Sequence, residues 1–364
     1  MPSGHSVISQ LNLTSFMGRR NIGHFTRRGV PYEQSVRHFA ARAFVQTANP
    51  PIRARGINHV TLDVSDVKRS VDFYQGLFGM PVINRQGTTS AGLQIGNGPQ
   101  HLGLSTAGSN APKINHICLA VDNFNVDRLK TILGRHGITE SEAADPMRLR
   151  VRMRGPEAGG GKEGTPEFYF RDPDGIVIQL QDPRYCGGAG PLGNICTRPE
   201  PSPKKGLIAL RNWSHTTNSG SDRARSNKFY QELFGFRIQA YQGPGNPVFG
   251  FGNAGQFLAF GAGGGQGAAG TARPGTINHF CMTMDNFNPE KVIKTLESVG
   301  IKPRGSAQGT PGPLVHYISM RMENRGGAKE GTPELYFTDP DGLIVQLQDT
   351  TYCGGGGVLG NVCI

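Results

Sequence analysis

The stretch from Glu163 to Asp182 reads EGTPEFYFRDPDGIVIQLQD, and the stretch from Glu330 to Asp349 reads EGTPELYFTDPDGLIVQLQD. Fifteen of these 20 positions are identical, at an offset of 167 residues. Identity at a fixed offset within one chain indicates an internal repeat. We conclude that this chain contains two copies of one domain.

Two further pairs of segments carry the repeat toward the N-terminus. DFYQGLFGM at residues 72–80 matches KFYQELFGF at residues 228–236. INHICLAVDNFN at residues 114–125 matches INHFCMTMDNFN at residues 277–288. The repeat therefore covers whole domains and is not confined to one short motif.

The domain boundaries follow from the repeat and from composition. The segment TRPEPSPKK at residues 197–205 lies between the copies and predicts a linker, because it is rich in proline and polar residues. A chain of 364 residues suits two domains of about 150 residues each. We predict a basic N-terminal segment without fixed structure, a first domain, a linker and a second domain, at residues 1–55, 56–196, 197–206 and 207–364.

Most of the positive charge lies in the N-terminal segment. The net charge is +11, and residues 1–55 contribute +7 of it through eight Arg, no Lys and one acid, Glu33. An Arg-rich, acid-poor N-terminus is typical of an organellar transit segment, and an extension without function is the alternative. The remaining residues show no concentrated basic stripe, so we expect no nucleic-acid partner. No apolar run approaches the roughly 18 residues of a membrane span, so we expect no membrane partner either.

Each copy divides again into two similar modules. A strand-like segment centred on His59 leads into a helix that begins after Asp66 and stops at Gly79, with apolar residues at helical spacing between them. A second unit begins at His116, and its helix is capped by Asn125. Short strands follow each helix. The pattern is strand, helix and three strands, four times over, which predicts an α+β protein.

Alternation along the strands predicts which side chains share a face. In residues 57–64 the alternate apolar positions form one face, and His59 lies on the other. The same reasoning places His116 and Gln179 opposite the apolar faces of their strands. The strand around His215 fits less well, because the residues opposite this histidine are polar: Asn212, Ser214 and Thr216.

With these residues in view, the sequence resembles the vicinal oxygen chelate superfamily, which includes glyoxalase I, extradiol dioxygenases and bleomycin-resistance proteins. The resemblance covers about residues 57–183 and 211–350. It implies two tandem domains, each of two paired βαβββ modules that form an open cup-shaped sheet with helices on the outside. It also implies metal ligands on the first strand of each module and on the last strand. These positions are His59, His116 and Gln179 in the first domain and His215, His279 and Gln346 in the second.

A sharper similarity is to the extradiol dioxygenases. Their motif around the last ligand has the form Y-x-x-[acid or amide]-P-x-G-x-x-x-E, and here Tyr169 leads through Asp172 and Gly175 to Gln179. The resemblance implies that His101 is an acid–base group and that Tyr169 hydrogen-bonds the bound oxygen. Both copies carry Gln where the dioxygenases carry Glu. A neutral amide donates less charge to Fe(II), and some glyoxalases use Gln, so a glyoxalase-type reading stays open.

The resemblance therefore implies a metal-dependent, extradiol-dioxygenase-like enzyme whose small-molecule substrate chelates the metal through vicinal oxygens. The expected cofactor is a divalent metal ion, with Fe(II) favoured and Zn, Ni or Mn as alternatives. Two other functions remain open: a glyoxalase-type lyase or isomerase that does not consume O₂, and a non-catalytic binder that needs no metal. We expect the first domain to be the more active copy, because Phe257 aligns with His101. The sequence leaves a homo-oligomer open.

Four of the six cysteines form a second repeated motif, CGGAGPLGNIC at residues 186–196 and CGGGGVLGNVC at residues 353–363. We predict a disulfide in each copy, with free thiols or a metal or redox role as alternatives. Disulfides require an oxidising compartment. Together with the Arg-rich N-terminus, they favour an organellar or exported protein and leave the cytoplasm open.

Overall fold

The computed structural model describes residues 49–252, 255–262, 273–306 and 309–364. Residues 1–48 of the predicted N-terminal segment lie outside them. The end of that segment needs correction, because residues 49–55 are part of the fold. Ile52 is fully buried, and its backbone N–H donates to the carbonyl oxygen of Leu233 at 3.1 Å. Ile52 therefore belongs to the fold, and the removal of its apolar side chain from water stabilises this part of the chain.

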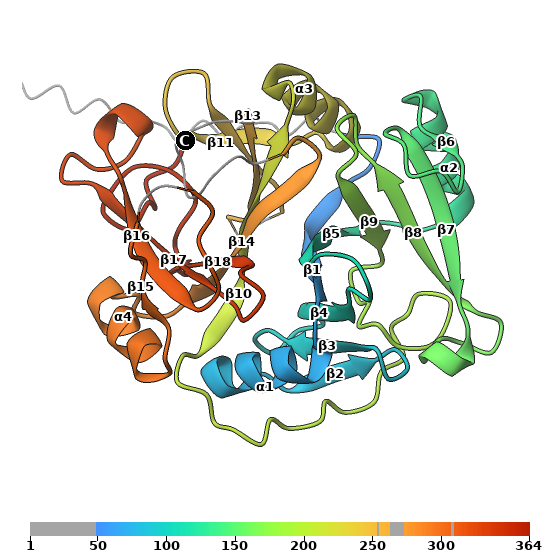
Figure 1. Cartoon of the computed structure of the whole chain (residues 1–364). Helices are drawn as coiled ribbons and strands as arrows, with labels where there is room; N and C mark the ends of the chain where they lie inside the picture. The colour runs from blue at the N-terminus through green and yellow to red at the C-terminus, as the bar shows by residue number, and fades with distance from the viewer. Residues whose placement is uncertain (1–48, 253–254, 263–272, 307–308) are drawn as a thin grey trace, which may run out of the picture. The chain divides into compact units, whose positions relative to one another are not determined.

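The first copy forms one nine-stranded sheet with the strand order β2-β3-β4-β1-β5-β9-β8-β7-β6 (Figure 1). Its strands are β1 (Ala54–Val64), β2 (Val82–Arg85), β3 (Ser90–Gln94), β4 (His101–Thr106), β5 (Lys113–Val121), β6 (Thr139–Glu140), β7 (Arg148–Arg154), β8 (Thr165–Arg171) and β9 (Val177–Gln181).

The second copy forms an equivalent nine-stranded sheet in the order β11-β12-β13-β10-β14-β18-β17-β16-β15. Its strands are β10 (Leu210–Gly220), β11 (Arg237–Tyr241), β12 (Pro247–Gly250), β13 (Phe257–Ala262), β14 (Thr276–Met284), β15 (Lys302–Pro303), β16 (Val315–Arg321), β17 (Thr332–Thr338) and β18 (Ile344–Asp349). The two sheets and their sparse helices confirm the predicted α+β class of two tandem open cups.

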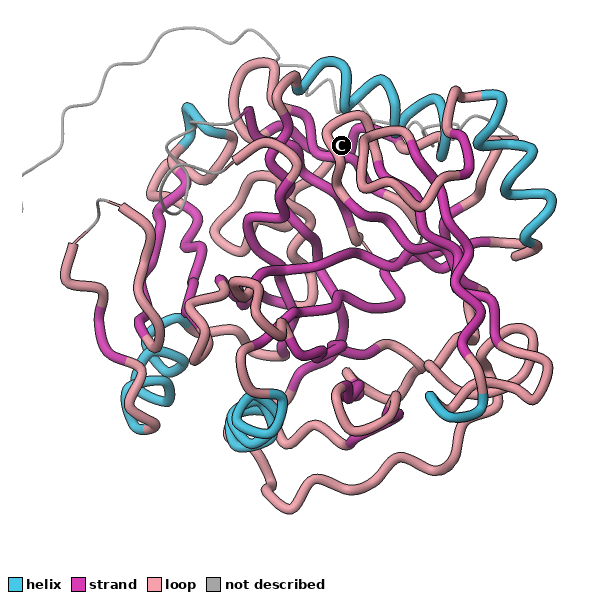
Figure 2. Tube along the Cα trace, turned by 45° about the vertical axis from the view of Figure 1, so that its right-hand side comes forward, coloured by secondary structure: helices cyan, strands magenta, loops and turns pink. Residues whose placement is uncertain are grey.

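Among the described residues, strands outnumber helical residues, and the helices are few and short (Figure 2). The α-helices are α1 (Val67–Phe78), α2 (Val126–Arg135), α3 (Arg223–Phe234) and α4 (Pro289–Ser298), and two 3₁₀ turns are η1 (Pro156–Ala158) and η2 (Glu323–Arg325). The predicted helix ends are confirmed. The Asp66 carboxylate accepts from the backbone N–H of Arg69, and Gly79 ends α1 with φ of 67°, a conformation that favours glycine. None of these helices combines the length and apolar character that a membrane-spanning helix needs.

Strand pairing brings the first strands of the two modules together at the centre of each sheet. In the first sheet, β1 pairs antiparallel with β5, and β9 lies on the far side of β5 in parallel. β4 runs parallel to β1 on its other side, with His101 level with His59. Residues from four separate parts of the chain therefore lie side by side on one face of this sheet.

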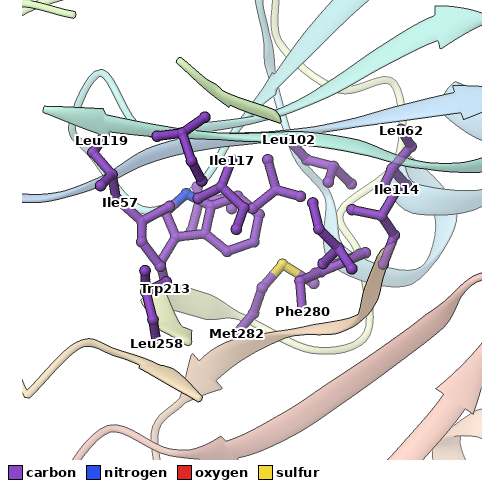
Figure 3. Close-up of a cluster of buried hydrophobic side chains, with 14 of the residues drawn as sticks. Ile57, Leu62, Leu102, Ile114, Ile117, Leu119, Trp213, Leu258, Phe280 and Met282 are labelled. Atoms are coloured by element: carbon purple, nitrogen blue, oxygen red, sulfur yellow. The ribbon is translucent and has the colours of Figure 1, made fainter. Parts of the chain in front are cut away.

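The other faces of the two central strand pairs pack against each other. Figure 3 shows Ile57, Ile117 and Leu119 from the first copy beside Trp213 and Met282 from the second. These side chains are almost completely buried. One continuous hydrophobic core therefore stabilises both copies, since burial of each large apolar side chain contributes about 1.5–3 kcal/mol.

The polar strand around His215 is explained by an irregularity in β10. The register between β10 and β14 shifts between Trp213 and His215, which is a β-bulge. The bulge turns Trp213 into the core, where its Nε1 donates to the carbonyl oxygen of Asn58 at 3.3 Å. Ser214, which alternation had placed on the helix-facing side, hydrogen-bonds the ring of His215 at 3.0 Å instead. A one-residue bulge reverses alternation, so the sequence pattern could not show this.

Two helices connect the copies. The Tyr74 hydroxyl on α1 donates to Asp339 of the second copy, and the Tyr230 hydroxyl on α3 donates to Asp172 of the first, both at 3.1 Å. The ring of Phe78 lies 6.2 Å from that of Phe337. Each Asp-Pro-Asp-Gly turn therefore leads into the last strand and also binds a helix of the other copy.

Candidate metal centre in the first cup

Three of the predicted ligand atoms converge on one point of the first cup. Nε2 of His59 lies 3.2 Å from Nε2 of His116 and 2.9 Å from Oε1 of Gln179. All three side chains are at least nine-tenths buried. β1, β5 and β9 each supply one of them, so the position of each donor is set by the sheet and not by a loop.

Hydrogen bonds to Nδ1 fix the orientation of both imidazole rings. Nδ1 of His59 lies 2.8 Å from Oδ1 of Asn58, and Nδ1 of His116 lies 2.7 Å from Oδ1 of Asn115. Each of these amide oxygens can only accept, because the Asn58 amide nitrogen donates to the Tyr185 carbonyl and that of Asn115 donates to Asp63. Nδ1 therefore carries the proton in each ring. Nε2 is left with a lone pair that points into the site, as in histidine ligands of metals.

This arrangement fits a cation. The lone pair of His59 Nε2 faces that of His116 and the amide oxygen of Gln179 within 3.2 Å, with no proton on either Nε2 in the assigned tautomers. The amide nitrogen of Gln179 is buried and has no hydrogen-bond partner within the described part of the chain. No group of three His, Cys, Asp or Glu side chains in the described ranges could hold a metal, and the third donor at this point would be the Gln179 amide oxygen. The donor set suits Zn, Ni, Mn or Fe.

Burial keeps these histidines neutral. Burial, followed by the neighbouring His101 and His116, lowers the pKa of His59 well below its ordinary value. Burial lowers the pKa of His101 and of His116 to about 4. Neutral imidazoles are the form that binds a metal ion.

His101 lies directly against His59. The two rings are stacked with centroids 4.6 Å apart, and Nδ1 of His101 lies 3.0 Å from the carbonyl oxygen of Pro99. Nδ1 therefore donates, and Nε2 is free to accept a proton. The next residue on the same face of β4 is Gly103, where an added Cβ would lie 2.5 Å from the Thr61 hydroxyl. No fourth ligand can therefore come from position 103.

A disulfide-closed loop follows a tyrosine that lies in this cup. Cys186 and Cys196 are bonded, with Cα atoms 6.3 Å apart, and Cys353 and Cys363 are bonded in the second copy, so the predicted pairing is present. Tyr185, at the start of the first loop, lies 5.7 Å from the ring of His59. It is 1% exposed. Tyr185 therefore shields the ring of His59 from bulk water.

The second cup keeps the ligand candidates but changes their surroundings. Nε2 of His215 lies 3.1 Å from Oε1 of Gln346, and Nε2 of His279 is buried without a partner among the described residues. Phe257 stacks on His215 at 4.2 Å, in the place that His101 occupies in the first cup. Ser214 replaces Asn58 behind the ring and, as a hydroxyl, can donate or accept, so it does not fix the tautomer.

A cavity of about 960 Å³ opens beside the first site. His116 and Tyr169 form part of its wall, whereas His59 and Gln179 do not line it. The candidate metal centre is therefore approached from the side of His116.

Comparison with known proteins agrees with this geometry. Residues 56–180 match the family model of the Glyoxalase/Bleomycin resistance protein/Dioxygenase superfamily. This match covers 125 of the 364 residues, all of them in the first copy. The second copy is similar to the matched segment through the internal repeat.

Individual relatives in the superfamily have different activities. The mitochondrial methylmalonyl-CoA epimerase of Bos taurus is 24% identical over 177 residues, which is 44% of this chain and 91% of the epimerase. The lactoylglutathione lyase of Escherichia coli O157:H7 is 29% identical over 144 residues, or 37% of this chain and 97% of the lyase.

Solved structures of the superfamily share the fold of the whole tandem unit. The Mn(II)-bound glyoxalase from Novosphingobium aromaticivorans superposes with a TM-score of 0.54 at 18% identity, covering 81% of this chain and 82% of its own. The 2,3-dioxygenase LapB from Pseudomonas sp. KL28 gives a TM-score of 0.56 at 15% identity, covering 81% and 92%. At these identities the likeness concerns the fold alone.

The first copy also contains a buried polar cluster that the sequence did not reveal. Glu167 is 1% exposed and accepts from Nε of Arg154 at 2.7 Å, from the Tyr185 hydroxyl at 2.8 Å and from the Tyr169 hydroxyl at 3.1 Å. The Tyr169 ring also meets His116 edge-on at 5.4 Å. Tyr169 therefore links this cluster to a candidate ligand, and its proton is donated to Glu167. The repeated pairs Arg154–Glu167 and Arg321–Glu334 were the signal that could have revealed the cluster.

Proposed function

We propose that the first cup binds one divalent metal ion through His59, His116 and Gln179 and catalyses proton transfer on a small substrate that chelates the ion through two vicinal oxygens. The observation that carries this proposal is the convergence of three uncharged donors, with the free Nε2 of His101 stacked beside them. A bound divalent ion supplies Lewis-acid polarisation of a chelated oxygen and so acidifies the neighbouring C–H bond.

The remaining residues handle the proton and exclude water. His101 is the group that accepts and returns the proton at Nε2, because the Pro99 carbonyl holds its Nδ1–H in place. Tyr169 fixes the orientation of His116 through its ring and is itself held by Glu167. Tyr185 lies against the rings of His59 and His101 and would exclude water from this side of the site.

Proton transfer is favoured over oxygen chemistry by the charge of the donor set. All three donors are neutral, and Glu167, a carboxylate of the same cup, already accepts from Arg154, Tyr169 and Tyr185. An ion held by neutral donors keeps more positive charge, so it polarises a carbonyl more strongly and supports O₂ activation less well. The two curated relatives described above are an epimerase and a lyase, which agrees with this choice.

Extradiol-type cleavage with Fe(II) is the second candidate. It is favoured by the tandem fold shared with a 2,3-dioxygenase and by the motif from Tyr169 to Gln179. The two candidates differ in one measurable respect, since cleavage consumes O₂ and proton transfer does not.

The test uses the purified full chain with Mn(II), Ni(II), Zn(II) or, anaerobically, Fe(II). We expect tight metal binding that His59→Ala abolishes, and metal-dependent exchange of substrate C–H for deuterium in D₂O, followed by NMR across a panel of 2-oxo acids and 2-hydroxy ketones. His215→Ala is the matched control and should leave exchange intact. Oxygen uptake with catechols in the Fe(II) form would instead support the second candidate. Failure of His59→Ala to reduce metal binding would overturn both.

A further inference from the structure

The strand β7 reads Arg148-Leu-Arg150-Val-Arg152-Met-Arg154, so every second residue is an arginine. β7 pairs with β8 so that Arg150 lies opposite Tyr169 and Arg152 lies opposite Glu167. Tyr169 contacts His116. Because alternate residues of a strand share a face, all four arginines lie on the face that carries the candidate metal centre. The folded part of the chain therefore does contain a concentrated basic stripe, contrary to the expectation from its overall charge.

The second copy shows which of these arginines the fold requires. Arg321 in β16 repeats Arg154, and its Nε lies 2.7 Å from Glu334 just as that of Arg154 lies 2.7 Å from Glu167. The residues that correspond to Arg148, Arg150 and Arg152 are Val315, Tyr317 and Ser319. The same scaffold therefore forms without these three positive charges.

Within the described residues, carboxylates do not neutralise this stripe. Arg148 hydrogen-bonds the Thr139 hydroxyl at 2.8 Å, and neither Arg148 nor Arg150 has a carboxylate within 4.0 Å. Arg150 lies over the ring of Tyr169 at 5.5 Å. Arg152 lies 3.5 Å from Glu167, but the charge of Glu167 is already balanced by Arg154. A surplus of positive charge remains on the wall of this cup.

Arg148, Arg150 and Arg152 all line the 960 Å³ cavity beside the metal centre, together with His116 and Tyr169. Arg171 lines the same cavity, and burial together with the nearby Arg150 lowers its pKa. The same cavity is lined by three carboxylates, Asp63, Glu142 and Asp341, and by six basic side chains, so positive charge is in excess. A concave wall with an excess of one sign of charge raises the local concentration of ions of the opposite sign. Guanidinium groups bind carboxylates and phosphates with paired, charge-assisted hydrogen bonds.

We propose that the first cup takes an anionic substrate, whose carboxylate or phosphate group is held by Arg148, Arg150 and Arg152 while its vicinal oxygens reach the metal centre past His116. This proposal names the substrate class for the proposed function. The part that concerns the metal centre rests on that function, and the anion site does not. The second cup lacks the three arginines, so it does not accept the same substrate.

The experiment measures binding of inorganic phosphate, pyrophosphate and malonate to the full chain by isothermal titration calorimetry at low and high salt. The test variant carries Arg148→Val, Arg150→Tyr and Arg152→Ser, the residues that the second copy shows to be compatible with the fold. The matched control, Arg135→Gln, removes an exposed arginine from the end of α2, away from the cavity. We expect the triple variant to weaken binding of the preferred anion at least tenfold, and the control to change it less than twofold. Comparison of malonate with the phosphates identifies the preferred oxyanion.

The two proposals fail separately. Anion binding is measured in metal-free and metal-loaded protein and in His59→Ala, so an arginine-dependent effect that survives without metal establishes the anion site even if the metal proposal fails. Equal affinity of the triple variant and the wild type, in protein that binds metal normally, overturns the anion site alone. A thermal melting curve for each variant shows that the fold is retained before the affinities are compared.

Discussion

The two cups of this protein share a scaffold and differ in the groups that could carry out chemistry. Both keep two histidines and a glutamine on the same strands, and both keep a buried glutamate bonded to an arginine and two tyrosines. The first cup alone has His101 against its ligand candidate and Asn58 behind it, where the second has Phe257 and Ser214. The shared glutamate cluster is therefore the best candidate for stability, and the groups around the ligand candidates that only the first cup has are the best candidates for activity.

The largest effect is expected from making the first cup like the second at position 101. His101→Phe should keep the stacked ring on His59 but remove the proton-accepting Nε2, because Phe257 stacks on His215 in the same way. We expect kcat to fall by about 10²–10⁴-fold, the usual contribution of a general acid–base group, with metal content unchanged. Steady-state kinetics and metal analysis check this. A kcat within about threefold of the wild type would remove His101 from the mechanism.

The buried glutamates should behave alike in the two cups. Glu167→Ala leaves Arg154 buried without its partner, and Glu334→Ala does the same to Arg321. Each change should lower the free energy of unfolding by about 3–5 kcal/mol, measured by urea denaturation, because it leaves an uncompensated buried charge. Asp72→Ala is the control, since it breaks the exposed Lys68–Asp72 pair and should cost less than about 0.5 kcal/mol. A strong effect in only one cup would show that the cluster is not shared scaffold.

Restoring a negative charge to the donor set separates a ligand from a structural amide. Gln179→Glu should tighten divalent-metal binding by about tenfold or more, because the carboxylate adds a charge to the set of neutral donors. If Gln179 only hydrogen-bonds across the cup, Glu buries an unpaired charge, lowers the melting temperature and leaves metal affinity unchanged. Metal titration followed by thermal melting distinguishes these results. Gln346→Glu provides the same comparison in the second cup.

The smallest effect concerns the contacts between the copies. Burial raises the pKa of Asp172 and of Asp339 from 3.8 to about 6. Between these pH values the folded chain binds more protons than the unfolded chain, so these groups stabilise the fold increasingly as pH falls. Each should add about 1 kcal/mol to the free energy of unfolding between pH 7 and pH 5. Asp172→Asn and Asp339→Asn should lack that increment, and an unchanged pH dependence in the variants would contradict the raised pKa values.

Local patterns in the sequence predicted the parts of this structure that depend on local rules. The helix ends at Asp66 and Gly79 follow from capping, and alternation on three strands places His59, His116 and Gln179 on one face, while their role as ligands came only from the resemblance. The internal repeat also predicted that the second copy would have the same strands and helices as the first. No such rule connects residues that meet only through strand pairing across the sheet.

The arginines of β7 show this limit. In sequence, alternating arginines read as the solvent-exposed face of a strand, and only the pairing with β8 reveals that they share a face with Tyr169 and Glu167. Trp213 shows a second limit, because a bulge that cannot be seen in the sequence reverses the alternation. Pairing register and bulges depend on the packing of the whole sheet, not on neighbouring residues.

The crossed contacts of α1 and α3 make the two copies dependent on each other. Tyr74 and Tyr230 are fully buried, and each reaches an aspartate of the opposite copy. A cut within residues 197–206 would leave two fragments. Each separated fragment would expose the apolar surface that the other copy buries, as in the subunits of an obligate dimer. Unlike identical subunits, however, copies joined in one chain can change independently. One copy can therefore acquire catalytic residues while the other copy only stabilises the fold.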